Sequence, residues 1–151
     1  MVDSIKHNIK SEILNQLEQK IQDTSNAITS LTESRDMDTK SSAGDKHETS
    51  RAKIQTEIDQ LSKQLNHIQS QKNNLSAIDT SHLHSIADVG SLVETNKGYF
   101  FISTGWGRIK IQNENYFVIS IESPIGRLLK NKKEGDSIQF RDTAYDILSV
   151  S

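Results

Sequence analysis

The sequence has no cysteine, a single proline and no aromatic residue before Tyr99. Without cysteine the chain forms no disulfide, no thiolate metal site and no cysteine nucleophile, which fits a reducing compartment. No apolar run approaches the ~20 residues that a membrane-spanning helix needs. The first residues also lack the apolar segment of a secretory signal. We therefore expect a cytoplasmic protein with no membrane partner.

An excess of charge of one sign is missing as well. The chain carries 18 basic and 20 acidic residues, and each half of it is close to balanced. Neither half has the positive field of a stand-alone nucleic-acid-binding domain. Any contact with nucleic acid is therefore expected to be local or to depend on a protein partner.

The composition changes sharply along the chain. All aromatic residues, and every glycine except Gly44, lie in the second half, where Pro124 is also found. Two compositions in one chain of 151 residues indicate two architectures. We predict a helical region over residues 1–76 and a second domain over residues 77–151.

The helical region shows two narrow apolar stripes, over residues 5–31 and 54–75, with apolar residues at intervals of three and four. Such stripes are typical of a coiled-coil seam. Their arrangement is nearly symmetric about residue 43, which predicts an antiparallel hairpin with its tip at about residues 36–48. The pairs predicted to meet are Leu31 with Ile54, Ile28 with Ile58, Ile21 with Leu65, and Leu17 with Ile68.

The second domain has the period of β-strands, with short runs separated by Gly- and Asn-containing turns. Ser123 and Pro124 predict the N-cap and first position of one helix that ends near Lys130. The fold class is therefore α+β, with a mostly antiparallel sheet and one helix after the hairpin. The predicted strands cover residues 91–95, 99–103, 108–111, 116–121, 137–140 and 145–150.

The predicted tip contains two acids, Asp45 and Glu48, whose spacing of three places them on one face of a helix. Two carboxylates alone bind Mg²⁺ weakly, but they can complete a site whose other ligands come from a partner. The same spacing is that of a capping box, and acids in a first helical turn suit the helix dipole. Both interpretations remain open from spacing alone.

Two motifs resemble those of the bacterial Gre transcript-cleavage factors. The first is Gly44–Glu48 at the tip, and the second is Ser123–Leu129 followed by Lys132–Asp136. The order and lengths of both halves match as well, so the resemblance covers essentially the whole chain. It implies an FKBP-like second domain that docks on RNA polymerase and a hairpin that enters the polymerase's secondary channel.

The resemblance also implies roles for individual residues. Asp45 and Glu48 would be assisting acids that hold a Mg²⁺ ion shared with the polymerase beside backtracked RNA, so the chain has no cofactor of its own. It would stimulate the polymerase's cleavage of the RNA 3′ end as a monomer and would not be an enzyme itself. The implied RNA-contacting residues are Arg35, Lys40, Lys46, Arg51 and Lys53, and the implied docking residues are Ser123, Pro124, Ile125 and Arg127.

The chain departs from that family at several positions. Residues 49–52 differ from the family pattern, Asp36 and Asp38 add acids near the tip, and Gly126 replaces the usual alanine. A non-cleaving regulator that occupies the polymerase channel is therefore an alternative. A prolyl isomerase, suggested by the FKBP-like half, is another. His82 and His84 lack further ligands for a metal site.

Overall fold

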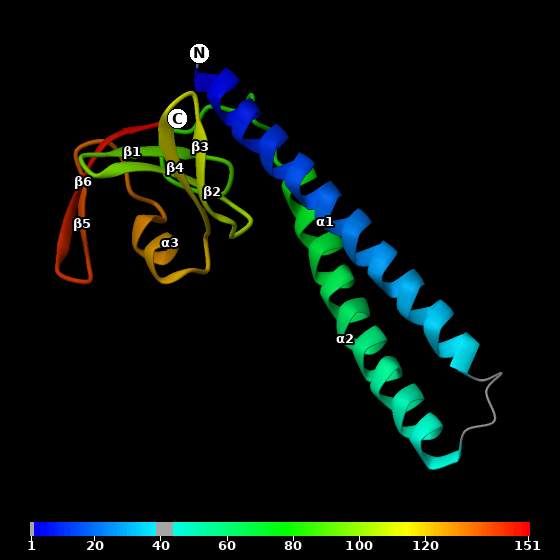
Figure 1. The fold of residues 1–151 in the computed structure, drawn as a ribbon. Helices are drawn as coiled ribbons and strands as arrows, with labels where there is room; N and C mark the ends of the chain where they lie inside the picture. Colours follow the sequence, from blue (N-terminus) through cyan, green and yellow to red (C-terminus); the bar gives the residue numbers. More distant parts are fainter. Residues whose placement is uncertain (1, 39–43) are drawn as a thin grey trace. The chain divides into compact units, whose positions relative to one another are not determined.

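A computed structural model describes residues 2–38 and 44–151, with side chains placed for residues 5–37 and 48–151. The fold is α+β, as predicted (Figure 1). Residues 1–14 and 73–151 form one compact unit, and residues 15–72 form another. The elements are α1 (Val2–Asp38), α2 (Gly44–Ser76), β1 (Leu92–Thr95), β2 (Gly98–Ser103), β3 (Gly107–Ile111), β4 (Glu114–Ser120), α3 (Pro124–Leu129), β5 (Ser137–Phe140) and β6 (Thr143–Val150).

Residues 15–72 form an antiparallel pair of helices (Figure 1). The predicted stripe lies in the seam, where Leu17 is fully buried and Ile58 and Ile68 are nearly so. Thr24 is buried in the same stripe, although its polarity hid it from the apolar pattern. Helix α1 extends to Asp38, well past the predicted end near Leu31, because neither glycine nor proline interrupts it.

Two side-chain contacts between the helices indicate a register that is shifted from the predicted pairing. Arg35 Nη1 donates a hydrogen bond to Gln55 Oε1 at 2.6 Å, and Lys72 forms an ion pair with Glu18. The two residue numbers of each contact have their midpoint at 45, whereas those of the predicted pairs have their midpoint near 43. A two-residue change in the midpoint moves one helix by about one turn along the other, since a turn is about 3.6 residues.

Lys10 of α1 caps the carboxyl end of α2, and Lys6 and Lys10 bind carbonyls of the loop that follows. The last carbonyl groups of a helix have no partner within the helix, and α2 has no basic residue in its own last turn. Lys10 Nζ donates to the carbonyls of Ser76 (3.1 Å) and Ile78 (2.7 Å), and Lys6 Nζ donates to that of His82 (2.7 Å). The start of α1 is thereby joined to the loop that follows α2.

The sheet has the strand order β3-β4-β2-β1-β6-β5. All neighbouring strands are antiparallel except β2 and β4, which pair in parallel with Phe100 beside Phe117. The prediction of a mostly antiparallel sheet is confirmed. The parallel pair arises because β3 forms a hairpin with the outer side of β4, which leaves β4 to pair with β2.

The turns of two hairpins have the backbone that a two-residue connection requires. Gln112 and Asn113 join β3 to β4, and Arg141 and Asp142 join β5 to β6, all with φ between +50° and +67°. Positive φ at both central residues matches the right-handed twist of the strands. These turns therefore set the register of the strands that they connect.

Both faces of the central strands are buried. Helix α3 packs against β4 and β5, and an apolar cluster lies on one face of the sheet. Phe101 and Val118, whose side chains point to the other face, are also almost fully buried. Four consecutive residues of β2 are accordingly buried. The cluster consists of Ala87, Val93, Phe100, Ile102, Leu129, Ile138 and Ile147.

Steric crowding explains why position 126 is a glycine. A Cβ atom there would lie 2.1 Å from the carbonyl oxygen of Ser120 and 2.8 Å from Ser123 Oγ. Real Cβ atoms do not approach other atoms so closely, and a backbone oxygen has little room to move. The alanine of the resembling family therefore does not fit this turn without a backbone shift.

We predict that Gly126→Ala destabilises the protein by about 1–3 kcal/mol, because the cost of overpacking exceeds the ~1 kcal/mol gain in helix propensity. The free energy of unfolding in urea measures the effect. Gly105→Ala is the matched control, since its Cβ would meet Ser120 Cβ at an ordinary 3.9 Å. Equal stability of the two variants would contradict the steric explanation.

Candidate functional site

The acidic pair predicted at the tip lies in the first turns of α2, which begins at Gly44. Asp45 and Glu48 are three residues apart in this helix, so their backbone positions share one face. Glu48 is exposed and has no hydrogen bond or ion pair with the described side chains. The side chains of Asp45 and Lys46, and the whole of Lys40, lie outside the described residues.

The described side chains do not form a complete metal site. Among residues 5–37 and 48–151, no group of three or more His, Asp or Glu side chains could hold a metal ion. Mg²⁺ requires near-octahedral oxygen ligands and keeps several waters where only one or two carboxylates are offered. Glu48 can therefore contribute one ligand, and further ligands would have to come from elsewhere. Its place near the start of α2 also suits the helix dipole.

The basic residues predicted near the tip differ in their surroundings. The Arg35 side chain is 26% exposed and lies between Asp36, at 3.3 Å, and Gln55, so it already joins the two helices. Arg51 is partly buried, and its Nε atom has no hydrogen-bond partner among the described atoms. Lys53 is exposed. Of these three cations, Lys53 is the most available to a ligand.

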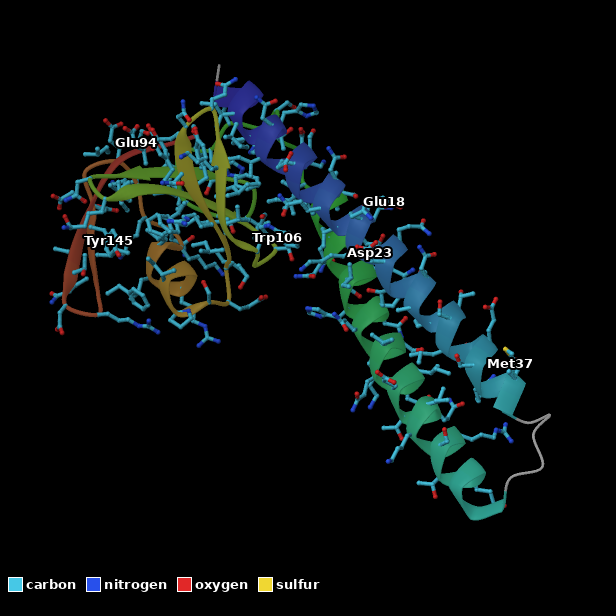
Figure 2. The ribbon with its side chains drawn as sticks, viewed as in Figure 1. Glu18, Asp23, Met37, Glu94, Trp106 and Tyr145 are labelled. Atoms are coloured by element: carbon cyan, nitrogen blue, oxygen red, sulfur yellow. The ribbon has the colours of Figure 1, made fainter. Side chains whose placement is uncertain are left out.

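The extra acid Asp36 and the methionine that follows it lie in the last turn of α1. Asp36 is exposed and pairs with Arg35, and Met37 is 72% exposed at the end of α1, where Figure 2 labels it. The side chain of Asp38 lies outside the described residues. The last turn of α1 thus presents a carboxylate and an apolar side chain to solvent.

The predicted start of α3 is confirmed in detail. Ser123 has extended backbone angles, and its Oγ accepts from the Gly126 N–H at 3.1 Å and donates to the Ser120 carbonyl at 2.7 Å. Pro124 occupies the first helical position, where its missing N–H costs nothing. Ser123 is therefore an N-cap that also fixes the preceding turn.

The other predicted docking residues divide between the surface and the core. Pro124 and Arg127 are exposed, and Leu128 beside them is 38% exposed. Ile125 packs against the apolar cluster of the sheet. Pro124, Arg127 and Leu128 are thus the members of this helix that a partner can reach.

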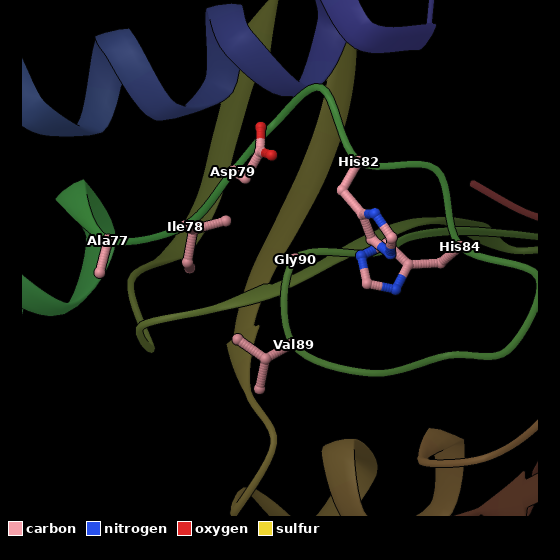
Figure 3. Close-up of a pocket in the computed structure, with 7 residues that line it drawn as sticks. All are labelled: Ala77, Ile78, Asp79, His82, His84, Val89 and Gly90. Atoms are coloured by element: carbon pink, nitrogen blue, oxygen red, sulfur yellow. The ribbon is translucent and has the colours of Figure 1, made fainter.

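A cavity that sequence analysis missed lies beside the loop between α2 and β1 (Figure 3). Its volume is about 260 Å³. The rings of His82 and His84 meet edge to face there, with centroids 4.6 Å apart. The H-x-H spacing drew attention to these residues as metal ligands, but no sequence signal indicated that they line a cavity. The lining residues are Ala77, Ile78, Asp79, His82, His84, Val89 and Gly90.

Two ionisable groups in this cavity have shifted pKa values. Burial lowers the pKa of His84 below its ordinary range, the nearby positive charges of Lys6 and His82 add to the effect, and Asp88 opposes it. Hydrogen bonds from the side chain and backbone N–H of Ser81 lower the pKa of the Asp79 carboxyl. At neutral pH the cavity therefore contains a neutral His84 imidazole and an ionised Asp79 carboxylate.

A second cavity, of about 210 Å³, lies where the parallel strands β2 and β4 end. Ser103 at the end of β2 and Ser120 at the end of β4 line it, together with Thr104 and Glu122, which follow these strands. Neither this cavity nor the His82–His84 cavity is lined by Phe, Tyr or Trp. Each cavity is lined by both polar and apolar residues.

Among the described residues, none of the helices is both long and apolar enough to cross a membrane. In comparisons with known proteins, no family model matches the chain, and no curated protein matches it.

We predict that Ser123→Ala lowers the free energy of unfolding by about 1 kcal/mol, because the Gly126 N–H loses its acceptor. Ser123→Thr keeps the hydroxyl and is expected to stay within about 0.5 kcal/mol of wild type. Urea denaturation monitored by the fluorescence of Trp106 measures both variants. A Ser123→Ala variant as stable as Ser123→Thr would show that the cap contributes nothing.

Proposed function

We propose that this protein is a transcription elongation factor that binds RNA polymerase through an FKBP-like second domain. The helical hairpin then enters the secondary channel of the polymerase, and its tip stimulates Mg²⁺-dependent cleavage of backtracked RNA. The proposal rests on the resemblance of the tip and α3 motifs to the bacterial Gre factors. The protein supplies no complete active site of its own.

The observation that carries the proposal is the exposed Glu48 at the start of α2, in an antiparallel hairpin that buries its apolar seam. The Glu48 side chain is exposed and is therefore available to a ligand. From residue 15 to residue 38, α1 rises about 35 Å at ~1.5 Å per residue. A narrow hairpin of this length suits delivery of an acid into a channel.

The chemistry requires a partner that supplies the remaining ligands. Asp45 and Glu48 would complete the coordination of a Mg²⁺ ion that the polymerase also holds, and that ion would activate a water for attack on the phosphodiester. Lys53, Lys46 and Lys40 would neutralise RNA phosphates. Arg35 is assigned mainly to the link between the helices because Gln55 and Asp36 engage its guanidinium group.

Docking on the polymerase is assigned to the exposed part of α3. Pro124 and Arg127 are accessible there, and Ser123 and Ile125 hold the helix in place. A prolyl isomerase is the less favoured alternative, because the resemblance that suggests it concerns the second domain alone. That alternative also gives the hairpin no role.

We expect the wild-type protein to shorten the RNA of a stalled, backtracked polymerase complex from its 3′ end when Mg²⁺ is present. Glu48→Gln and Asp45→Asn should each reduce the cleavage rate at least about tenfold, since even indirect metal partners contribute that much. Glu57→Gln is the matched control, because Glu57 is an exposed glutamate on the same helix. Gel analysis of 3′-labelled RNA measures the rate.

The same assay tests the alternative of a non-cleaving regulator. If the wild-type protein binds the complex and slows elongation without cutting RNA, the regulator replaces the cleavage factor. If Glu48→Gln and Glu57→Gln cut equally fast, the tip acids have no catalytic role. Direct measurement of polymerase binding by each variant keeps loss of docking separate from loss of chemistry.

For docking, we predict that Arg127→Glu weakens polymerase binding about three- to tenfold, because an exposed charge at an interface rim contributes modestly. Lys110→Glu, on the exposed side of β3, makes the same charge change and should leave the affinity unchanged. Fluorescence anisotropy with labelled protein measures both. Equal loss in the two variants would indicate a general charge effect and not a docking residue.

A further inference from the structure

We propose that residues 77–90 form a pH-sensitive clamp on the first turns of α1, in which protonation of His84 places a second positive charge beside the buried ammonium group of Lys6. This inference is independent of the proposed function. The clamp holds at neutral pH, when His84 is neutral, and loosens in mild acid.

The clamp consists of hydrogen bonds from two α1 lysines to carbonyls after α2. Lys6 is completely buried, and its Nζ donates to the His82 carbonyl at 2.7 Å. Lys10 Nζ donates to the Ile78 carbonyl at 2.7 Å. A buried ammonium group is stable only with such partners, so the fit of residues 77–82 around it matters for stability.

His84 connects this loop to the sheet. Its ring lines the cavity and meets His82 edge to face (Figure 3). A Cβ atom built on Gly90 would lie 3.4 Å from His84 Nε2, so the ring rests against the Gly90 backbone. The Gly90 N–H in turn donates to the Ile102 carbonyl of β2 at 2.7 Å. We therefore take the Gly90 amide, which lies against the His84 ring and bonds to β2, as the reporter of a change at His84.

The charges that face His84 mostly oppose its protonation. Lys6 from α1 and His82 from the same loop are both cations or potential cations, and Asp88 is the acid that favours the charged form. Asp79 lies on the same cavity wall, but Ser81 and the charges of His82 and Lys10 engage its carboxylate.

The direction of the pH effect follows from proton binding. Burial, Lys6 and His82 together lower the pKa of His84 in the folded protein below the ordinary value of 6.5. In the pH range just below that value, the unfolded chain binds more protons at this residue than the folded protein does. Stability therefore falls as the pH drops through this range and is fully retained above it.

The wild-type protein provides the first test, by NMR titration of its histidines between pH 8 and about 5, above the ordinary range of carboxyl groups. We expect His84 to titrate below the ordinary histidine value of 6.5. The hydrogen-exchange protection factor of the Gly90 amide should fall about threefold or more over the same range. A His84 midpoint at or above the ordinary value, or constant protection of Gly90, would overturn the proposal.

A variant pair provides the second test. His84→Gln cannot gain a proton, so its Gly90 protection factor and its Tm should stay nearly constant from pH 7.5 to about 5.5. His67→Gln, which removes an exposed histidine of α2, should keep the full pH dependence of wild type. If His84→Gln loses protection and Tm in acid as wild type does, another group is responsible and the clamp is wrong. The wild-type titration decides the question even if the variant does not fold.

Discussion

The burial of one apolar stripe of α1 against one apolar stripe of α2 is the interaction on which the helical hairpin and the proposed function depend. Each fully buried Ile or Leu contributes about 1.5–3 kcal/mol, and Leu17, Ile58 and Ile68 are buried almost completely. Single helices with this many polar residues are only marginally stable in water. Without the seam, the two helices would separate and Glu48 would have no fixed position.

The compact unit that contains the sheet depends on close backbone contacts as well as on its apolar cluster. Lys10 caps the Ser76 carbonyl at the end of α2, Ser123 caps α3, and Gly126 lets that helix approach the Ser120 carbonyl. Lys6 and Lys10 also bind carbonyls of the loop after α2. The lysines and Ser123 form hydrogen bonds to backbone groups, and Gly126 has no side chain that would collide with the Ser120 carbonyl. These backbone contacts fix the position of α3 and of the loop after α2. They therefore also fix the positions of Arg127 and His84, which those two segments carry.

Much of the fold could be predicted from the sequence because it depends on local periodicity and local caps. The seam residues, the approximate strands and the Ser123-Pro124 helix start all follow from such signals. The helix register could not, because a slip of one turn still buries the same stripes, and the contacts of Glu18 with Lys72 and of Arg35 with Gln55 reveal it. The parallel pairing of β2 with β4, the burial of Lys6 and the His84 cavity depend on distant parts of the chain. The metal-binding role of Asp45 remains a prediction, since its side chain lies outside the described residues.

The most direct test of the hairpin uses the absence of cysteine from the sequence. The double variant Glu18→Cys/Lys72→Cys joins two positions whose side chains form an ion pair between the helices. The double variant Glu18→Cys/His67→Cys instead joins positions expected to meet if the helices were centred near residue 43. With a short bis-maleimide cross-linker, which spans the gap that the two long side chains bridge, we predict an intramolecular cross-link in the 18/72 variant and much less in the 18/67 variant. Efficient closure of the 18/67 pair, or only intermolecular products from the 18/72 pair, would contradict the hairpin described here.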